Sequence, residues 1–526
     1  VSIDATANDG KPSENNKGLL SYGIYLKSES TDENYKEYNV SNTDISLVKG
    51  VGIVVGTSEK DKNTKLTLSG STINVDSYSE GDSAETGIGI YTNYGVIALT
   101  GGNTINTSYG VGIYGGQDSN ISIGTEEGED KKDTLNLRGY SVGVYSKGGT
   151  VTLGQNTNIV FQQGHAYGEE DENNVSKGVG AYVIDGTLTS SANIKIDDKN
   201  TIVSDGIVGL LGKQSDKNNE VTIKNSGNIT LSGNSVVGIA GIGLEANTDE
   251  EKQEKSKVTI TNSGDITISG NATKLSSGIY GKDTNIINGG TISVGQYATG
   301  IYYTGTKAND IYSERIILTG EHSIGAILTG ETNYTNIVGV TGDTTKEINL
   351  GIYLNNYSSE STNIGNITLG SESLGLYINN SSTTINSLGN ISIGTGGIGI
   401  ASIGTKDENN VINDKVTITS NGSISVGEGG TAIYVQDSIL NMKSLAGVTS
   451  GKDGAVLHIN NGVLKVDSTI NELTFDGNIG MILENGGNIQ SSNGEVSNIK
   501  VLNGGTGILI KGETAGNPSI LADETT

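Results

Sequence analysis

Residues 225–233 read Asn225-Ser226-Gly227-Asn228-Ile229-Thr230-Leu231-Ser232-Gly233, and the short phrase Gly238-Ile239-Ala240 follows soon after. The first stretch begins with an Asn/Ser/Gly turn and then alternates polar with aliphatic residues, which is the pattern of a β-strand with one buried face. Close copies occur at 262–270, 388–394 and 421–427. Short strands that recur between Gly and Asn turns predict a repeat architecture.

The phrase is a small residue followed by an aliphatic residue and, in most copies, by Tyr. From Gly23 to Gly507 there are 17 steps over 484 residues, so the mean step is 484/17, or about 28, and the shortest steps are 22 to 25 residues. Longer steps contain polar insertions. The copies begin at Gly23, Gly52, Gly89, Gly112, Gly143, Gly180, Gly209, Gly238, Gly278, Gly300, Gly325, Gly351, Gly375, Gly399, Ala432, Ala455, Gly480 and Gly507.

This spacing predicts an all-β fold, a single-stranded parallel β-helix of about 18 coils, right-handed by the general bias of crossover connections. Each coil of two or three strands would stack its inward aliphatic residue on that of the next coil. At roughly 4.8 Å per coil, the rod would be about 85 Å long. We expect one continuous domain, with coils over about 19–511 and polar ends at 1–18 and 512–526.

The third residue of the phrase should face outward, because neighbouring side chains of a strand point to opposite faces. An outward tyrosine ladder stabilises stacked parallel strands, which is the simpler interpretation. The alternative is a stripe that binds a glycan or a protein, since exposed aromatic residues anchor interfaces. The tyrosines at this position are Tyr25, Tyr91, Tyr114, Tyr145, Tyr182, Tyr280, Tyr302, Tyr353, Tyr377 and Tyr434.

Hydrophilic insertions should project from the turns, where recognition usually resides. They lie at 27–38, 58–63, 76–85, 125–133, 162–177, 213–220, 245–257 and 405–415. The insertion at 162–177 is the most informative, because a histidine and a tyrosine lie beside an acidic run; a solvated loop is the simpler interpretation. The loop residues predicted to bind a partner are Tyr35, Tyr38, Tyr78, His165, Tyr167, Glu169, Glu170 and Asp171.

The composition excludes several classes of function. With 33 basic and 59 acidic residues the net charge is −26, which disfavours nucleic acid as a partner. The chain has no cysteine, and His165, His322 and His458 are isolated in sequence, so we expect no metal and no cofactor. No apolar run approaches the roughly 18 residues of a membrane-spanning helix. No signal peptide is recognisable at Val1.

The rival enzymatic interpretation is a β-helical polysaccharide lyase or hydrolase. Such enzymes need carboxylates that converge on one face from neighbouring coils. In this sequence the acidic residues concentrate in the insertions. We therefore expect a protein that is not an enzyme, and three or more acidic side chains in one groove would reverse that expectation.

The Gly-Ile-Tyr coils, the Asn-Ser-Gly-Asn-Ile-Thr-Leu-Ser-Gly phrases, the absence of cysteine and the Lys/Asn/Ile-rich composition resemble the passenger domain of a bacterial type V autotransporter. More narrowly, the chain is similar to the large fusobacterial outer-membrane autotransporter adhesins. The resemblance implies a secreted passenger displayed at the bacterial cell surface, a virulence factor in cell adhesion. Its membrane attachment would be a C-terminal β-barrel that this stretch lacks.

The resemblance further implies binding to a host cell-surface protein, to a glycan or to other bacteria, by a monomer. A purely structural stalk, with its binding head outside these residues, is the alternative. Binding of the isolated chain to host cells or to glycans would separate the two hypotheses, because a stalk alone should bind nothing.

Overall fold

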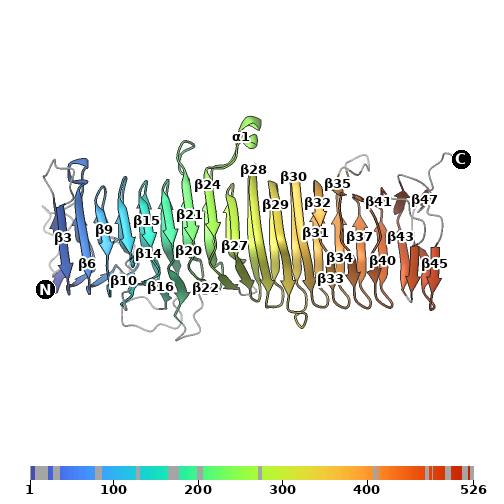
Figure 1. Cartoon of the computed structure of the whole chain (residues 1–526), viewed down its shortest axis with the longest axis horizontal. Coiled ribbons are helices and arrows are strands. Elements are labelled where there is room, and N and C mark those ends of the chain that lie inside the picture. Colours follow the sequence, from blue (N-terminus) through green and yellow to red (C-terminus); the bar gives the residue numbers. More distant parts are fainter. Residues whose placement is uncertain are drawn as a thin grey trace. The chain divides into compact units, whose positions relative to one another are not determined.

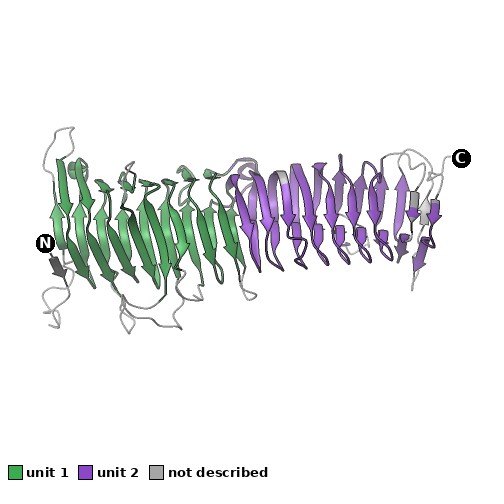
Figure 2. Cartoon of the chain, turned by 60° about the horizontal axis from the view of Figure 1, so that its bottom comes forward, with its two compact units in different colours: residues 1–244, 256–284 green, residues 245–255, 285–526 purple. Residues whose placement is uncertain are grey.

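The computed structural model is almost entirely β-structure and forms two compact units, coloured separately in Figure 2. Unit 1 comprises Val1–Leu244 and Ser256–Thr284, and unit 2 comprises Glu245–Lys255 and Asn285–Thr526. The structure describes residues 2–5, 22–27, 36–77, 86–125, 131–163, 177–197, 205–270, 275–406, 412, 414–467, 473–476, 478–491, 499–511 and 519–521.

Unit 1 is a parallel β-solenoid in which each coil contributes up to three strands (Figure 1). The phrase lies on β2 (Tyr22–Leu26), β5 (Val51–Val55), β8 (Ile88–Thr92), β11 (Val111–Gly115), β14 (Tyr140–Lys147), β17 (Lys177–Ile184), β20 (Ile207–Lys213), β23 (Val237–Ile242) and β26 (Ser276–Lys282).

Two further strand series complete the coils of unit 1. The second series is β3 (Lys36–Ser41), β6 (Thr64–Ser69), β9 (Val96–Leu99), β12 (Asn120–Ile123), β15 (Thr150–Leu153), β18 (Thr187–Ser190), β21 (Val221–Asn225) and β24 (Val258–Asn262). The third series is β1 (Ser2–Ala5), β4 (Asp44–Leu47), β7 (Thr72–Asp76), β10 (Thr104–Ser108), β13 (Asp133–Arg138), β16 (Thr157–Gln162), β19 (Asn193–Ile196), β22 (Ile229–Ser232) and β25 (Ile266–Ser269).

The middle residue of the phrase forms the predicted inward column. In unit 1, Ile90 pairs with Ile113 and Ile113 with Val144 in parallel register, and all three side chains are fully buried. In unit 2, Ile400 pairs with Ile433 in the same way. Because each coil is too thin to bury its own aliphatic residues, this stacking supplies the core, and the prediction of a parallel β-solenoid is confirmed.

Unit 2 begins its described strands with four long ones that run around the corners of the coil: β27 (Asn285–Val294), β28 (Ala298–Leu318), β29 (Ile324–Gly342) and β30 (Leu350–Leu369). The phrase continues on β31 (Leu374–Asn379), β34 (Ile398–Ile403), β37 (Thr431–Gln436), β40 (Ala455–Asn460), β43 (Ile479–Glu484) and β46 (Thr506–Lys511).

The other strands of unit 2 are shorter. They are β32 (Ser382–Leu388), β33 (Ile391–Ile393), β35 (Lys415–Ile418), β36 (Ile424–Val426), β38 (Ile439–Met442), β39 (Val448–Ser450), β41 (Val463–Val466), β42 (Leu473–Asp476), β44 (Asn488–Ser491), β45 (Ile499–Leu502) and β47 (Ser519–Leu521). Strands β42 and β45 pair only with each other among the described residues.

Several details differ from the sequence prediction. Strand β1 pairs with β4, and β47 with β44, although both lie in segments expected to be polar ends. The copy read as Ala455-Val456-Leu457 is out of register by one residue, because Leu457 pairs with Ile433 and His458 with Tyr434. The insertion at 245–257 contains a short helix, α1 (Asp249–Gln253), capped by the Thr248 hydroxyl. Among the described residues, no helix is long and apolar enough to cross a membrane.

Candidate functional site

Four consecutive coils of unit 1 carry the predicted tyrosines in contact with one another. The ring centroids of Tyr91 and Tyr114 lie 5.1 Å apart and those of Tyr114 and Tyr145 lie 5.0 Å apart, both stacked. Tyr182 meets Tyr145 edge to face at 5.4 Å. All four side chains are half-buried. The faces of the stacked rings therefore cover one another, and the ladder presents ring edges and hydroxyl groups to its surroundings.

The surroundings of this ladder are less polar than water. Burial raises the pKa of Tyr91, Tyr145 and Tyr182, and nearby phenol or carboxylate groups raise each pKa further. For Tyr91 those neighbours are Tyr114, Tyr22 and Tyr94. Tyr94 thus lies close to one end of the ladder, although it is not part of the phrase.

The tyrosine ladder of unit 2 is interrupted. Tyr353 and Tyr377 stack at 4.8 Å, but Ala401 occupies the next coil. Tyr434 then meets His458 edge to face at 5.0 Å. His458 holds the place of a ladder residue and binds Glu484, with 3.0 Å between ring nitrogen and carboxylate oxygen. Its role was missed because the phrase there was read one residue too early.

Three more of the predicted ladder tyrosines lie on other coils of the two units. Tyr280 pairs with Ala240 in unit 1, and Tyr302 pairs with Ile327 in unit 2. Both are half-buried, as predicted for an outward column. Tyr25 is 47% exposed, and its hydroxyl lies 3.0 Å from that of Thr57.

Most of the predicted loop residues, namely Tyr35, Tyr78, His165, Tyr167, Glu169, Glu170 and Asp171, lie outside the described residues. Tyr38 is described and lies on β3, not in a projecting loop. It pairs with the fully buried Leu66, so its side chain continues an inward column, and its hydroxyl donates to the Lys27 carbonyl at 2.6 Å.

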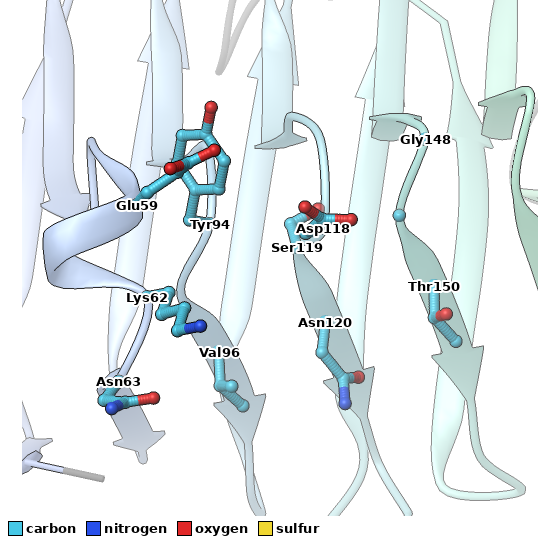
Figure 3. A pocket seen from close by; sticks show the side chains of 11 residues that line it. Glu59, Lys62, Asn63, Tyr94, Val96, Asp118, Ser119, Asn120, Gly148 and Thr150 are labelled. Carbon is cyan, nitrogen blue, oxygen red and sulfur yellow. The ribbon is translucent and has the colours of Figure 1, made fainter. Parts of the chain in front are cut away.

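A polar groove of about 700 Å³ lies beside the ladder on unit 1. Figure 3 shows its lining side chains on four successive coils. Val96, Asn120 and Thr150 are register partners on β9, β12 and β15 and form one column. The other lining residues are Glu59, Lys62, Asn63, Tyr94, Asp118, Ser119, Gly148 and Gly149.

One end of the groove is formed by the insertion at 58–63. It folds into a 3₁₀ turn, η1 (Glu59–Asp61), which the Ser58 hydroxyl closes by donating to the buried Asp61 carboxylate at 3.0 Å. At the start of this insertion, the Gly56 carbonyl accepts the backbone N–H groups of both Asn93 and Tyr94. Tyr94 is therefore held in place by the preceding coil.

The corner residues of the next coils are equally fixed. Asp118 has a φ of +59°, which Asp tolerates better than most residues, and Gly148 follows it on the next coil with a φ of +81°. The buried Ser119 donates to the Gly116 carbonyl, and its own carbonyl accepts from Thr150 N. A Cβ at Gly149 would lie 2.5 Å from the Ser119 hydroxyl oxygen, so glycine is required there. The groove is thus largely preformed.

Several polar side chains of the groove are not used by the fold. Among the described residues, the side chains of Glu59, Lys62, Asp118 and Asn120 make no hydrogen bond or ion pair. Asparagines elsewhere on unit 1 pair across coils, as when Asn106 donates to Asn74 at 2.7 Å and Asn136 to Asn106 at 2.8 Å. No other ring stacks on Tyr94 within the described chain. These groups are available to a ligand.

The groove holds two carboxylates, Glu59 and Asp118, which come from coils two steps apart. The described residues contain no group of three or more His, Cys, Asp or Glu that could hold a metal ion. This site was partly predictable from the sequence, since the predicted insertion at 58–63 forms one end. The turn residues between phrase and second strand, such as Tyr94 and Asp118, were not singled out.

No family model, curated protein or solved structure matches the chain significantly.

Proposed function

We propose that this chain is a cell-surface adhesin of the autotransporter type that binds carbohydrate chains in the groove of unit 1. The observation that supports the proposal most directly is the set of unengaged polar side chains in a preformed groove. Carbohydrates present many hydroxyl groups, which amides, carboxylates and hydroxyls bind by hydrogen bonds. A preformed site loses little conformational entropy on binding.

The dimensions suit an extended ligand. The groove crosses four coils, so three inter-strand steps of roughly 4.8 Å give a length of about 14 Å. An oligosaccharide that runs along the solenoid axis would meet Asn120 and Thr150 in turn and place an apolar sugar face on the free ring of Tyr94. The adjacent ladder would add a row of phenol hydroxyls beyond the groove.

The surface location rests on the resemblance of the repeats to autotransporter passengers and on the cysteine-free composition. The β-solenoid is compatible with it. A solenoid can present a groove far from its ends, because each coil depends only on its neighbours for stability.

The test is titration of the intact 526-residue chain with oligosaccharides of three or more sugars, followed by calorimetry. Tyr94→Ala and Asn120→Ala should each weaken binding about 2- to 10-fold, as expected for one lost contact of about 0.5–1.5 kcal/mol. Tyr377→Ala, which removes a ladder tyrosine of unit 2, is the matched control and should bind like the parent chain.

Three results would contradict the proposal. An intact chain that binds no carbohydrate would favour the structural stalk. Equal binding by the Tyr94→Ala variant and the parent would place the site elsewhere. Release of new reducing ends during the titration would indicate a hydrolase.

A further inference from the structure

We propose that the groove prefers oligosaccharides that carry free amino groups over neutral or anionic ones. The inference rests on the proposed function and specifies the chemical class of the ligand. It starts from the charges that line the groove. Glu59 and Asp118 contribute two carboxylates and Lys62 one ammonium, all on exposed side chains. The groove is therefore negative and has one carboxylate that Lys62 cannot balance.

Asp118 is the carboxylate best placed to select a cation. It lies in the corner row between Tyr94 and Gly148, in the middle of the four coils, and Gly148 adds no side chain beside it (Figure 3). Its neighbour Ser119 is fixed by hydrogen bonds, so the backbone that carries the carboxylate is rigid. A ligand ammonium at this point would form a charge-assisted hydrogen bond, which is about twice as strong as a neutral one.

This carboxylate differs from that of the aspartate at the same corner of another coil of unit 1. Asp185 occupies the same corner two coils further on and has a similar φ of +53°. Its carboxylate is engaged by the backbone N–H of Ser215 at 2.7 Å and by the Ser215 hydroxyl. Desolvation alone would raise the pKa of Asp185, but the hydrogen bonds from Ser215, together with those from Asn219 and Asp216, outweigh it and lower the pKa. Asp118 has the same geometry without a partner for its side chain among the described residues.

The charge of the whole chain acts in the same direction. A net charge of −26 repels sulfated, sialylated or uronic acid-rich polymers and attracts a polycation, an effect that salt screens. The neutral groups on the column, Asn120 and Thr150, would bind hydroxyls in all of these sugars alike. Selectivity among glycans of equal length should therefore follow their charge.

The test compares a trimer of glucosamine with the same trimer N-acetylated, by calorimetry on the intact chain. The titration is run at about pH 6, where the amines of the ligand are charged. At low salt we expect the free-amine trimer to bind about 5- to 20-fold more tightly, and the ratio to shrink in 0.5 M salt. Asp118→Asn should abolish most of the preference.

Asp453→Asn is the matched control, because Asp453 is an exposed aspartate of unit 2 with a φ of +60°. It changes the net charge by the same amount and should keep the preference. Equal affinity for the two trimers, or a preference that survives in an Asp118→Asn, Glu59→Gln double variant, would overturn the inference and leave the carbohydrate-binding proposal standing. If neither trimer nor any other oligosaccharide binds, the proposed function itself fails.

Discussion

The two units place residues of opposite size at the same position of the coil. This position, two residues after the middle of the phrase, faces the core in both units. In unit 1 it holds Leu26 and Val55 on β2 and β5, and then mostly small residues, namely Thr92, Gly115, Ser146, Val183, Gly212, Gly241 and Gly281. In unit 2 it holds mostly large ones, namely Tyr303, Leu328, Leu354, Ile378, Ser402, Val435, Ile459 and Leu483.

The reason is that different strands supply the side chains that fill this part of the core in the two units. A Cβ at Gly212 would lie 2.7 Å from side-chain carbons of both Val221 and Ile223, so the second strand already occupies that space in unit 1. In unit 2 the phrase strand fills it instead. The small residues of unit 1 lead into the tight corner that carries Tyr94 and Asp118. The same repeat thus forms coils with two kinds of core packing. The polar groove lies on unit 1, whose coils have small residues at this position.

The largest effect on stability is expected from truncating a large core residue of unit 2. Tyr303→Ala should destabilise the protein by about 3–5 kcal/mol, because Tyr303 is fully buried and the cavity cannot close in a stacked core. Urea unfolding measures the change. Ser146→Ala, at the same position in unit 1, is the control; the Ser146 hydroxyl is buried without a partner, so the free energy of unfolding should stay the same or rise slightly.

Alkaline pH should lower the stability through unit 2, because this unit also buries Tyr334 and Tyr357. Burial raises the pKa of Tyr357 to about 12, above the ordinary value of 10.0, and also raises that of Tyr334. The folded state holds the phenol proton that the unfolded state loses. The contribution of Tyr357 to the free energy of unfolding is therefore fully present below pH 10. Between pH 10 and pH 12 it falls by about 1.4 kcal/mol per pH unit, or about 3 kcal/mol in total.

Urea unfolding between pH 8 and pH 12 measures this slope, and in Tyr357→Phe it should be shallower. Tyr145→Phe removes a half-buried phenol of the unit 1 ladder whose pKa is also raised by burial, and as the comparison it should change the slope less. A slope that is identical in the parent and the Tyr357→Phe variant would contradict the assignment.

Making unit 1 resemble unit 2 should also be destabilising. Gly212→Leu places a side chain against Val221 and Ile223 and should cost about 1–3 kcal/mol by overpacking. The neighbouring Lys213→Leu adds the same side chain at an exposed position and should change the unfolding free energy little. Unchanged stability of Gly212→Leu would show that the two kinds of core packing interconvert easily.

The smallest expected effect is a difference in stability between Tyr→Phe substitutions at two buried tyrosines of unit 2. The Tyr357 hydroxyl lies 2.8 Å from that of the buried Thr362, whereas the Tyr334 hydroxyl has no hydrogen-bond partner. Tyr357→Phe should therefore cost about 1 kcal/mol, and Tyr334→Phe should be neutral or stabilising, as thermal unfolding would show. Equal losses in both variants would mean that the Tyr334 hydroxyl is satisfied in solution.

Much of the fold was predictable from local pattern. The phrase fixed the inward column, since an aliphatic residue such as Ile113 recurs with a strand period and must stack on Val144 of the next coil. It also predicted the outward column of tyrosines. The predicted register is wrong at 455–457, because Ala455 and Val456 are both acceptable as the first residue of the phrase and the third residue is His458, not a tyrosine. Three tyrosines in the core, at 303, 334 and 357, were not anticipated because hydrophobicity alone does not tell which face of a bent strand is inside.

The sequence by itself determined that successive coils pair in parallel, because identical short strands can bury their aliphatic side chains only against their own copies. The tertiary structure alone decided which strand fills the corner of each coil, and hence where the groove lies. Space in a packed core is shared among side chains distant in sequence. Glycines such as Gly149 and Gly212 are needed only because neighbouring atoms leave no room for a Cβ.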